Sequence, residues 1–283
     1  MKPCLGEGFL FSKYSFEARM EEIHKIGYEY VETGINPHAP KDEIEEHGRI
    51  MRRNGIKPAA IGGGGPIASL NEETRRQAVE NVERQINVAQ MLDCGVITCE
   101  MSGGTSGQRD ECIQAFKVSA EELAPVLERA GVHAAFEAHP GDFVEDNNTA
   151  VDILKEIGHD NIGYMYCGPH TFILGGDPAD MIEYAADILK WVHVADTYKQ
   201  ERIIVSDASK GYVSMVGLPD YKGLTAHMHL VPGDGEVDFE SIFRTLKKVG
   251  YGGFVSAIPF DSVTPVQTAT QSLKMMRKYI DDA

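Results

Sequence analysis

The feature that most constrains this sequence is an alternation, repeated along the chain, between a short apolar run and a longer amphipathic segment. The apolar runs are rich in β-branched residues, which is typical of strands buried on both faces of a parallel sheet. The clearest runs are 28–33, 57–61, 95–100, 132–138, 162–167, 191–195 and 254–258, with a weaker first run at 3–8. The alternation therefore predicts a chain of repeated β–α units.

The amphipathic segments carry apolar residues at helical spacing and predict helices at 16–26, 72–92, 121–130, 149–157, 178–189, 239–249 and 266–280. Asp177 and Pro178 form a helix start, and glycines such as Gly27, Gly95 and Gly131 are expected to end helices. Eight such pairs in about 250 residues predict an α/β fold, a (β/α)8 TIM barrel. An open doubly wound sheet is the alternative, because alternation alone does not prove closure. We expect one domain over 1–283, with one long loop at about 197–235 after the seventh strand.

Charge and cysteine content exclude several classes of protein. Lys plus Arg number 27 and Asp plus Glu number 43, so the formal net charge is 27 − 43 = −16. Such a chain repels nucleic-acid backbones and anionic membranes, so neither is expected as a partner. The five cysteines form no CxxC pair, and no long apolar stretch opens the chain. Reduced thiols and a cytoplasmic location are therefore expected.

Polar residues gather where the predicted strands end, which is where barrel enzymes carry their chemistry. The strand ends and the long loop supply Glu32, Glu100, Glu137, His139, Cys167, His170, His193, Asp196, Arg202, His227 and His229. Glu137 and His139 point the same way, because side chains alternate along a strand. One buried carboxylate with several imidazoles predicts a divalent-metal site open to substrate.

Each of these residues also has a structural interpretation. A single histidine at a strand end is often a hydrogen-bonded structural group, and His227 and His229 could form a pair on a surface loop. Cys167 could be a small buried residue. Cations of the long loop such as Arg202 could bind a phosphate or carboxylate, or remain solvated.

With these residues in place, the sequence resembles the xylose-isomerase-like barrel superfamily of sugar isomerases, sugar epimerases and endonuclease IV. The resemblance rests on FEAHP at 136–140, the segment 163–177, VHVADT at 192–197, and the Gly-rich turn and helix at 232–250. The sequence looks closest to inositol-catabolism isomerase-like proteins through HPGDF at 139–143, PHTF at 169–172 and HMH at 227–229. It is also similar to the large subunit of carbon-glycoside deglycosidases.

The resemblance implies a divalent metal and proton transfer at the carbon next to a sugar carbonyl. The superfamily's usual ligands are Glu, Asp, His and Glu from strands five to eight, and Glu137 and His193 match the first and third. Cys167 and Ile258 stand at the other two positions, so the usual set cannot form. His139, His170 and His229 are candidate replacements. An imidazole-rich set favours manganese, zinc or cobalt over magnesium.

The leading functional hypothesis is a metal-dependent isomerase, epimerase or lyase that acts on a keto-sugar, an inositol derivative or a sugar phosphate. Its expected metal ligands are Glu137, His170, His193 and His229. Its catalytic residues would be Glu100 and a histidine base, His139 or His227. Substrate contacts are expected from Glu32, Cys167, Asp196 and Arg202. The alternative is a catalytically degenerate sugar-binding barrel or one subunit of a complex. A nuclease is disfavoured by the charge, and a homo-oligomer or partner subunit is expected.

Overall fold

The computed structural model describes residues 1–283 except 9, 174, 199–211, 215–225 and 262. Residues 171, 212–214 and 226–228 are described by their backbone alone. Everything stated below concerns this described part of the chain.

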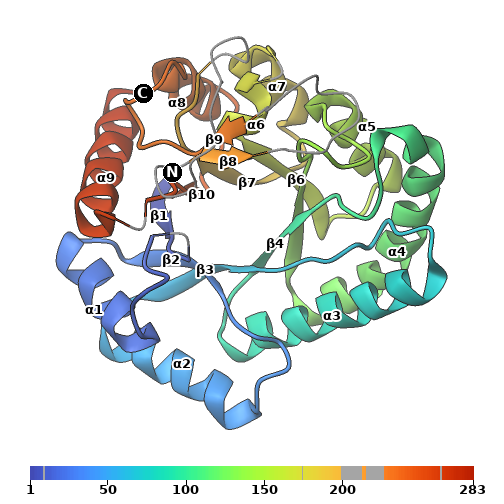
Figure 1. Cartoon of the computed structure of the whole chain (residues 1–283), viewed down its shortest axis with the longest axis horizontal. Helices are drawn as coiled ribbons and strands as arrows, with labels where there is room; N and C mark the ends of the chain where they lie inside the picture. Colours follow the sequence, from blue (N-terminus) through green and yellow to red (C-terminus); the bar gives the residue numbers. More distant parts are fainter. Residues whose placement is uncertain (9, 174, 199–211, 215–225, 262) are drawn as a thin grey trace.

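Parallel strands close into a barrel, which confirms the (β/α)8 prediction (Figure 1). The strands are β1 Lys2–Gly6, β2 Tyr30–Gly34, β3 Lys57–Gly62, β4 Val96–Glu100, β5 His133–Glu137, β6 Ile162–Cys167, β7 Leu189–Val194 and β10 Phe254–Ala257. Their order around the barrel is β1-β10-β7-β6-β5-β4-β3-β2, and β1 pairs in parallel with both β10 and β2. Because the first and last strands are hydrogen-bonded to each other, the open-sheet alternative is wrong.

Helices surround the barrel in the order of the chain (Figure 1). They are α1 Phe16–Ile26, α2 Lys41–Arg53, α3 Glu72–Met91, α4 Arg109–Ala130, α5 Asn147–Ile157, α7 Pro178–Ala185, α8 Phe239–Lys248 and α9 Pro265–Asp282. A short helix, α6 Gly168–Ile173, follows β6 directly and brings His170 to the end of that strand. The sequence pattern did not predict it.

Three helices differ from the expectation. Helix α7 ends at Ala185, four residues before the predicted end, because Leu189 is already the first residue of β7. Helix α4 begins at Arg109, twelve residues before the predicted start, because small and polar residues such as Ala115 and Ser119 lie on its buried face and weaken the apolar pattern. Helix α3 ends without a left-handed glycine at Gly95. Asp93 takes the left-handed conformation instead, with φ 56°. Gly27 and Gly131 end their helices in that conformation as predicted, with φ 104° and 66°.

A cluster of small and large apolar side chains fills the interior of the barrel. It contains Cys4, Ala59, Ala60, Ala135, Met165 and Trp191, all buried. Met165 also lines the cavity at the mouth of the barrel, so this cluster forms the floor of that cavity. Because this apolar cluster occupies the interior of the barrel, the polar residues at the strand ends meet above it, at the C-terminal mouth.

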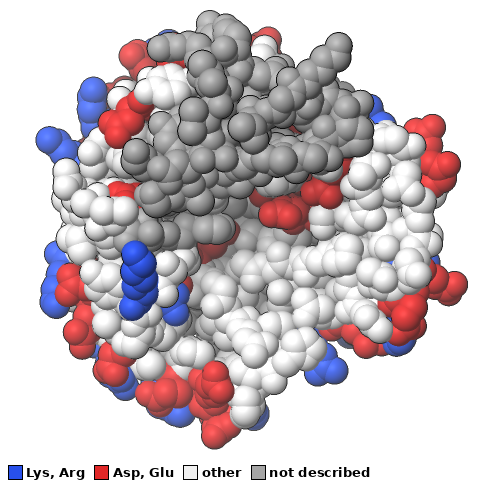
Figure 2. Space-filling model, in the orientation of Figure 1, with Lys and Arg blue, Asp and Glu red and all other residues white. Residues whose placement is uncertain are grey.

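The predicted long loop after β7 carries structure of its own. Two short antiparallel strands, β8 Tyr212–Ser214 and β9 Ala226–Met228, pair within it. Asp196 and Leu230 form an isolated bridge at its base. Figure 2 shows a hollow near the middle of the barrel face, with acidic side chains at its border. No helix within the described ranges is long and apolar enough to cross a membrane.

Candidate metal centre and cavity

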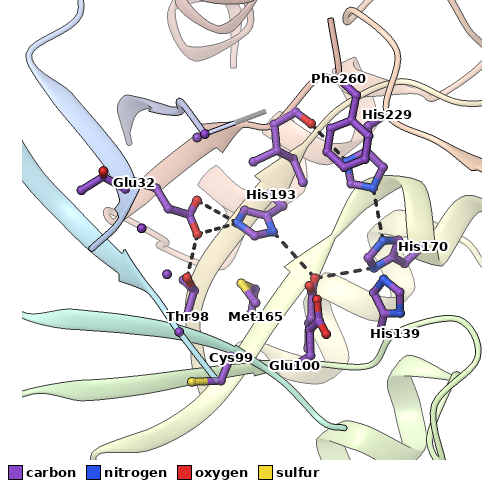
Figure 3. Close-up of a pocket in the computed structure, with 18 residues that line it drawn as sticks. Glu32, Thr98, Cys99, Glu100, His139, Met165, His170, His193, His229 and Phe260 are labelled. Carbon is purple, nitrogen blue, oxygen red and sulfur yellow. Dashed lines mark hydrogen bonds and ion pairs between the residues drawn. The ribbon is translucent and has the colours of Figure 1, made fainter. Parts of the chain in front are cut away.

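The strand ends surround a cavity of about 460 Å³ at the C-terminal mouth of the barrel. This volume lies in the usual range for small-molecule sites. In Figure 3, Glu32, Thr98 and Cys99 lie on one side of the cavity and His139, His170, His229 and Phe260 on the other. His193 extends between the two sides.

Glu32, at the end of β2, is held by donors from three other strands. Thr98 donates to Oε1 at 2.7 Å, while Ser256 and Trp191 donate to Oε2 at 2.8 and 3.3 Å. His193 Nε2 lies 3.1 and 2.9 Å from the two oxygens. Burial disfavours the charged form, but His193 and these hydrogen bonds outweigh it and lower the pKa of Glu32. Glu32 is therefore an ionised carboxylate whose partners are all protein groups.

The contact with Glu32 decides which nitrogen of His193 faces the cavity. An ionised carboxylate at Nε2 keeps the proton there, so Nδ1 is the nitrogen directed at Glu137. Nδ1 lies 3.7 Å from Glu137 Oε2. Both atoms are buried, and neither has a hydrogen-bond partner among the described residues. A carboxylate that orients a histidine in this way is a common partner of histidine ligands to metals.

Glu137, at the end of β5, lies between two imidazoles. His170 Nδ1 is 3.6 Å from Glu137 Oε2, the oxygen that also lies 3.7 Å from His193 Nδ1. Burial raises the pKa of Glu137, but His170 and His193 outweigh it and hold that pKa well below its usual range. Burial lowers the pKa of His170, but Cys167 and Glu137 outweigh it and raise it to about 10. Without a bound cation, the charge of Glu137 is thus balanced by protonated histidine.

His229 and His139 extend the cluster of imidazoles. His229 Nδ1 donates to the backbone carbonyl of Ile258 at 3.1 Å, and its Nε2 faces His170 Nε2 at 3.3 Å. Its ring stacks on Phe260, with the centroids 4.4 Å apart. The His139 ring lies edge-on to His170, with the centroids 4.7 Å apart. Burial and the neighbouring His170 lower the pKa of His139 to about 4.

Glu137 Oε2 and His193 Nδ1 are buried without a hydrogen-bond partner among the described residues, so we asked whether a divalent cation would fit between them. There are two groups of potential metal ligands, and within each group the ligand atoms lie within 4.8 Å of one another. One group consists of Glu137, Cys167 and His193, and the other of Cys167, His170 and His229. Ligands about 2.1 Å from a tetrahedral metal lie about 3.4 Å apart. The Glu137–His193 separation of 3.7 Å in the first group and the His170–His229 separation of 3.3 Å in the second are both close to this value. The residues therefore fit a borderline metal with nitrogen and sulfur ligands.

Two carboxylates adjoin this cluster without belonging to either group of ligands. Glu100, at the end of β4, lines the cavity, and burial and Glu137 raise its pKa. Asp142 follows β5, 3.9 Å from His139 Nδ1. Burial and Glu100 raise the pKa of Asp142 to about 7. Acidic groups crowd this edge of the cavity, where Figure 2 shows acidic side chains.

The structure places the remaining predicted substrate contacts differently. Asp196 lies below the 232–237 turn, where its carboxylate accepts from the backbone N–H groups of Thr197, Gly233 and Val237. This carboxylate is occupied by the backbone, so a substrate-binding role is not favoured. Cys167 is 1% exposed and contributes to both ligand groups instead of the cavity lining. The side chain of His227 and all of Arg202 lie outside the described residues.

Sequence reasoning missed Glu7, the buried carboxylate that directly follows the first strand. Glu7 is fully buried, accepts from Thr33 Oγ1 at 2.7 Å, and pairs with Arg19 of α1 at 2.8 Å. The signal was present, because Glu7 follows β1 as Glu32 lies at the end of β2. Phe260, two residues after Ile258, was also missed, since nothing local marks a stacking partner for His229.

A closed parallel barrel with buried carboxylate, thiol and imidazole groups at its C-terminal mouth has the architecture of the (β/α)8 barrels that carry their polar site residues on the strand ends. The sequence model of the xylose isomerase-like TIM barrel family matches residues 20–279. The chain therefore belongs to this family.

Individual relatives agree with this assignment. The chain is 21% identical to inosose isomerase of Bacillus velezensis over 98% of this chain and 95% of that protein. A structure of D-psicose 3-epimerase with D-tagatose from Clostridium cellulolyticum H10 superposes with a TM-score of 0.80 at 18% identity, covering 99% of both chains. The structure of IolI protein with a bound zinc atom gives 0.78 at 18% identity, covering 100% of this chain and 99% of that one.

Proposed function

We propose that the protein is a metal-dependent isomerase or epimerase that moves a proton at the carbon next to the carbonyl of a polyhydroxy ketone. Keto-sugars, keto-inositols and their phosphates have this chemistry, and a lyase would begin with the same proton abstraction. The relatives named inosose isomerase and D-psicose 3-epimerase support this class of substrate.

One observation carries the proposal, namely the buried Glu137 Oε2 with imidazole nitrogens at 3.6 and 3.7 Å on two sides. Glu137 and His193 would hold the metal together with Cys167, while His170 and His229 would be the imidazole ligands of the second group, which shares Cys167. The similar structure of IolI contains zinc, which supports zinc, cobalt or manganese over magnesium. When bound, such a cation polarises a carbonyl and its neighbouring hydroxyl and acidifies the adjacent C–H.

The chain's own residues would provide positioning and proton transfer. Glu32 fixes the ring of His193 through Nε2, so that Nδ1 keeps one orientation. His139 lines the cavity beside His170 and belongs to neither ligand group, which makes it the candidate general base. Glu100, which lines the same cavity from β4, would bind a substrate hydroxyl.

Metal analysis together with activity tests this proposal. Protein purified without added metal should contain close to one equivalent of zinc, cobalt or manganese. Chelation should abolish epimerisation of keto-sugars or inososes, and the metal should restore it. His139→Gln should lower kcat while the protein retains its metal. Full activity in metal-free protein would contradict the proposal.

A second candidate function rests on Ile258, which follows β10 and lines the cavity with an alkyl side chain. A mechanism that passes a proton between two opposed carboxylates would lack one of them at this strand. The barrel could then bind sugars without turnover, or act within a complex. Saturable binding of a polyol with no exchange of its C–H hydrogen into D₂O would favour this candidate.

A further inference from the structure

The side of the cavity opposite the imidazoles includes two glycines, Gly34 and Gly62, beside the side chains of Glu32 and Thr98. Gly34 pairs in register with Gly62 on the next strand, and Gly62 pairs with Thr98 on the strand after it. Partners in a parallel ladder present their side chains to the same face. The Thr98 hydroxyl reaches Glu32 inside the barrel, so this row faces the interior. Gly34 and Gly62 are called the glycine seat below.

The backbone of the glycine seat does not require glycine. Gly64 and Gly65, just beyond β3, have φ of 121° and 150°, which other residues rarely adopt. Gly34 and Gly62 have no such φ. Packing excludes a side chain at Gly6, another glycine of the cavity lining, because a Cβ there would lie 2.5 Å from Ile258 Cγ2. Gly8, which also lines the cavity, resembles the glycine seat in having open space around a Cβ.

Neither constraint applies to the glycine seat. A Cβ at Gly34 would meet no described atom within 4 Å, and one at Gly62 would touch Thr33 and Thr98 only at 3.9 Å. The missing side chains thus leave space inside the cavity, and this space is the remaining role for glycine at both positions.

The polar groups beside the glycine seat are already engaged. Thr98 and Thr33 donate their hydroxyl protons to Glu32 and Glu7. Both oxygens of Glu32 accept hydrogen bonds from protein groups. A ligand in this space gains room but no side-chain donor. The hydroxyls of an extended chain each need a partner, whereas the C–H face of a closed ring needs mainly space.

We propose that Gly34 and Gly62 form the seat of a closed six-membered polyhydroxylated ring, so that the protein selects ring-closed ketones over open-chain ketoses. This inference rests on the proposed function, because the ring would present its carbonyl edge to Glu137 and the histidines across the cavity. The ring could be a carbocycle or the ring of a keto-glycoside, since both have the same shape and C–H faces.

The test compares Gly34→Ala and Gly62→Ala with a matched control, Gly95→Ala. Gly95 lies between α3 and β4, at the opposite end of the barrel from the cavity. It also has no left-handed φ, and a Cβ there would meet no described atom within 4 Å. Binding is measured by calorimetry on metal-loaded protein with 2-keto-myo-inositol, methyl 3-keto-glucoside and D-fructose.

We expect Gly34→Ala to raise Kd for at least one of the two ring ligands by about tenfold or more, as added methyl groups do in filled sites. Gly62→Ala should raise the same Kd, while Kd for D-fructose and all values for Gly95→Ala should change less than about twofold. The ring ligand that responds tells a carbocycle from a glycoside. The proposal would be overturned if the variants weakened the binding of all ligands equally, if they left ring binding unchanged, or if the wild-type protein bound neither ring ligand.

Turnover separates this inference from the proposed function. If the Ala variants lose ring binding selectively but no ligand is converted, the proposed function fails and the seat stands. If ligands are converted and Gly34→Ala and Gly62→Ala bind ring ligands as the wild type does, the seat fails and the proposed function stands.

Discussion

The two sides of the cavity are built on opposite principles. The side formed by β5, β6, α6 and β7 places Glu137, Cys167, His170 and His193 close together. Burial and mutual charges there shift the pKa values of Glu137, His170 and His193. The side formed by β2 and β3 presents Gly34 and Gly62, which have no side chain, beside Glu32 and Thr33, whose polar groups are engaged by other protein groups. The first side can perform chemistry because of what it contains, and the second can select a shape because of what it omits. Substitutions should therefore have different signatures on the two sides.

The largest effect is expected from Glu137→Gln, which removes the buried charge while keeping the shape. We expect metal content to fall below a tenth of an equivalent and kcat/KM to fall on the order of a thousandfold, since a bound cation supplies several kcal/mol of transition-state stabilisation. Glu29→Gln, an exposed exchange at the start of β2, is the control. If Glu137→Gln retained metal and activity, Glu137 would be neither a metal ligand nor a catalytic group.

Cys167→Ser tests whether the thiol belongs to the chemical side. In cobalt-loaded wild-type protein, thiolate coordination should give a near-ultraviolet charge-transfer band, which the variant should lack. Its zinc affinity should fall by about 100-fold or more, because losing even an outer partner of a ligand costs 10- to 100-fold. Cys99→Ser, in the cavity lining, should keep the band. An unchanged spectrum in Cys167→Ser would leave this cysteine a packing residue.

Glu32→Gln should give an intermediate effect, because Glu32 lies at the glycine side but acts through His193. Metal affinity should fall about 10- to 100-fold through loss of the carboxylate that orients this histidine. Unfolding should become easier by about 1–3 kcal/mol, since an amide cannot accept from Thr98, Ser256, Trp191 and His193 together. Metal titration and urea unfolding measure the two effects. Unchanged metal affinity would show that His193 needs no such partner.

Asp196→Asn should give the smallest functional effect, because this carboxylate holds the 232–237 turn and not the cavity. We expect a loss of about 1–3 kcal/mol in the free energy of unfolding, from backbone N–H groups left without a full acceptor. KM and metal content should stay within about twofold of wild type. A large rise in KM with unchanged stability would instead restore the substrate-binding role expected from sequence.

Local sequence was sufficient for the strands and for the residues at their ends. Buried parallel strands need apolar side chains on both faces, so the polar residues Glu32, Glu137 and His193 stood out at the positions where those runs end. It could not distinguish their roles, because the role of Glu32 depends on His193, a partner 161 residues away that only barrel closure brings within reach. The backbone partners of Asp196 were equally hidden from the sequence, since they lie across a turn 37 and 41 residues away.

The absence of a side chain is a weaker signal than its presence. Gly62 begins a run of four glycines that reads as a flexible loop. Only its register with Gly34 and Thr98 shows that the first of them faces the cavity. A six-residue helix such as α6 likewise has too few turns for an amphipathic pattern, so the position of His170 could not be deduced.

The hydrogen bonds of Glu32 have a consequence for how this chain folds. Glu32 and Thr98 come from the first half of the chain, whereas Trp191, His193 and Ser256 come from the second. A partial barrel that lacks β7 and β10 would leave this carboxylate without most of its donors, and losing one partner of a buried pair costs about 3–5 kcal/mol. The same carboxylate that orients a candidate ligand thus penalises incomplete barrels.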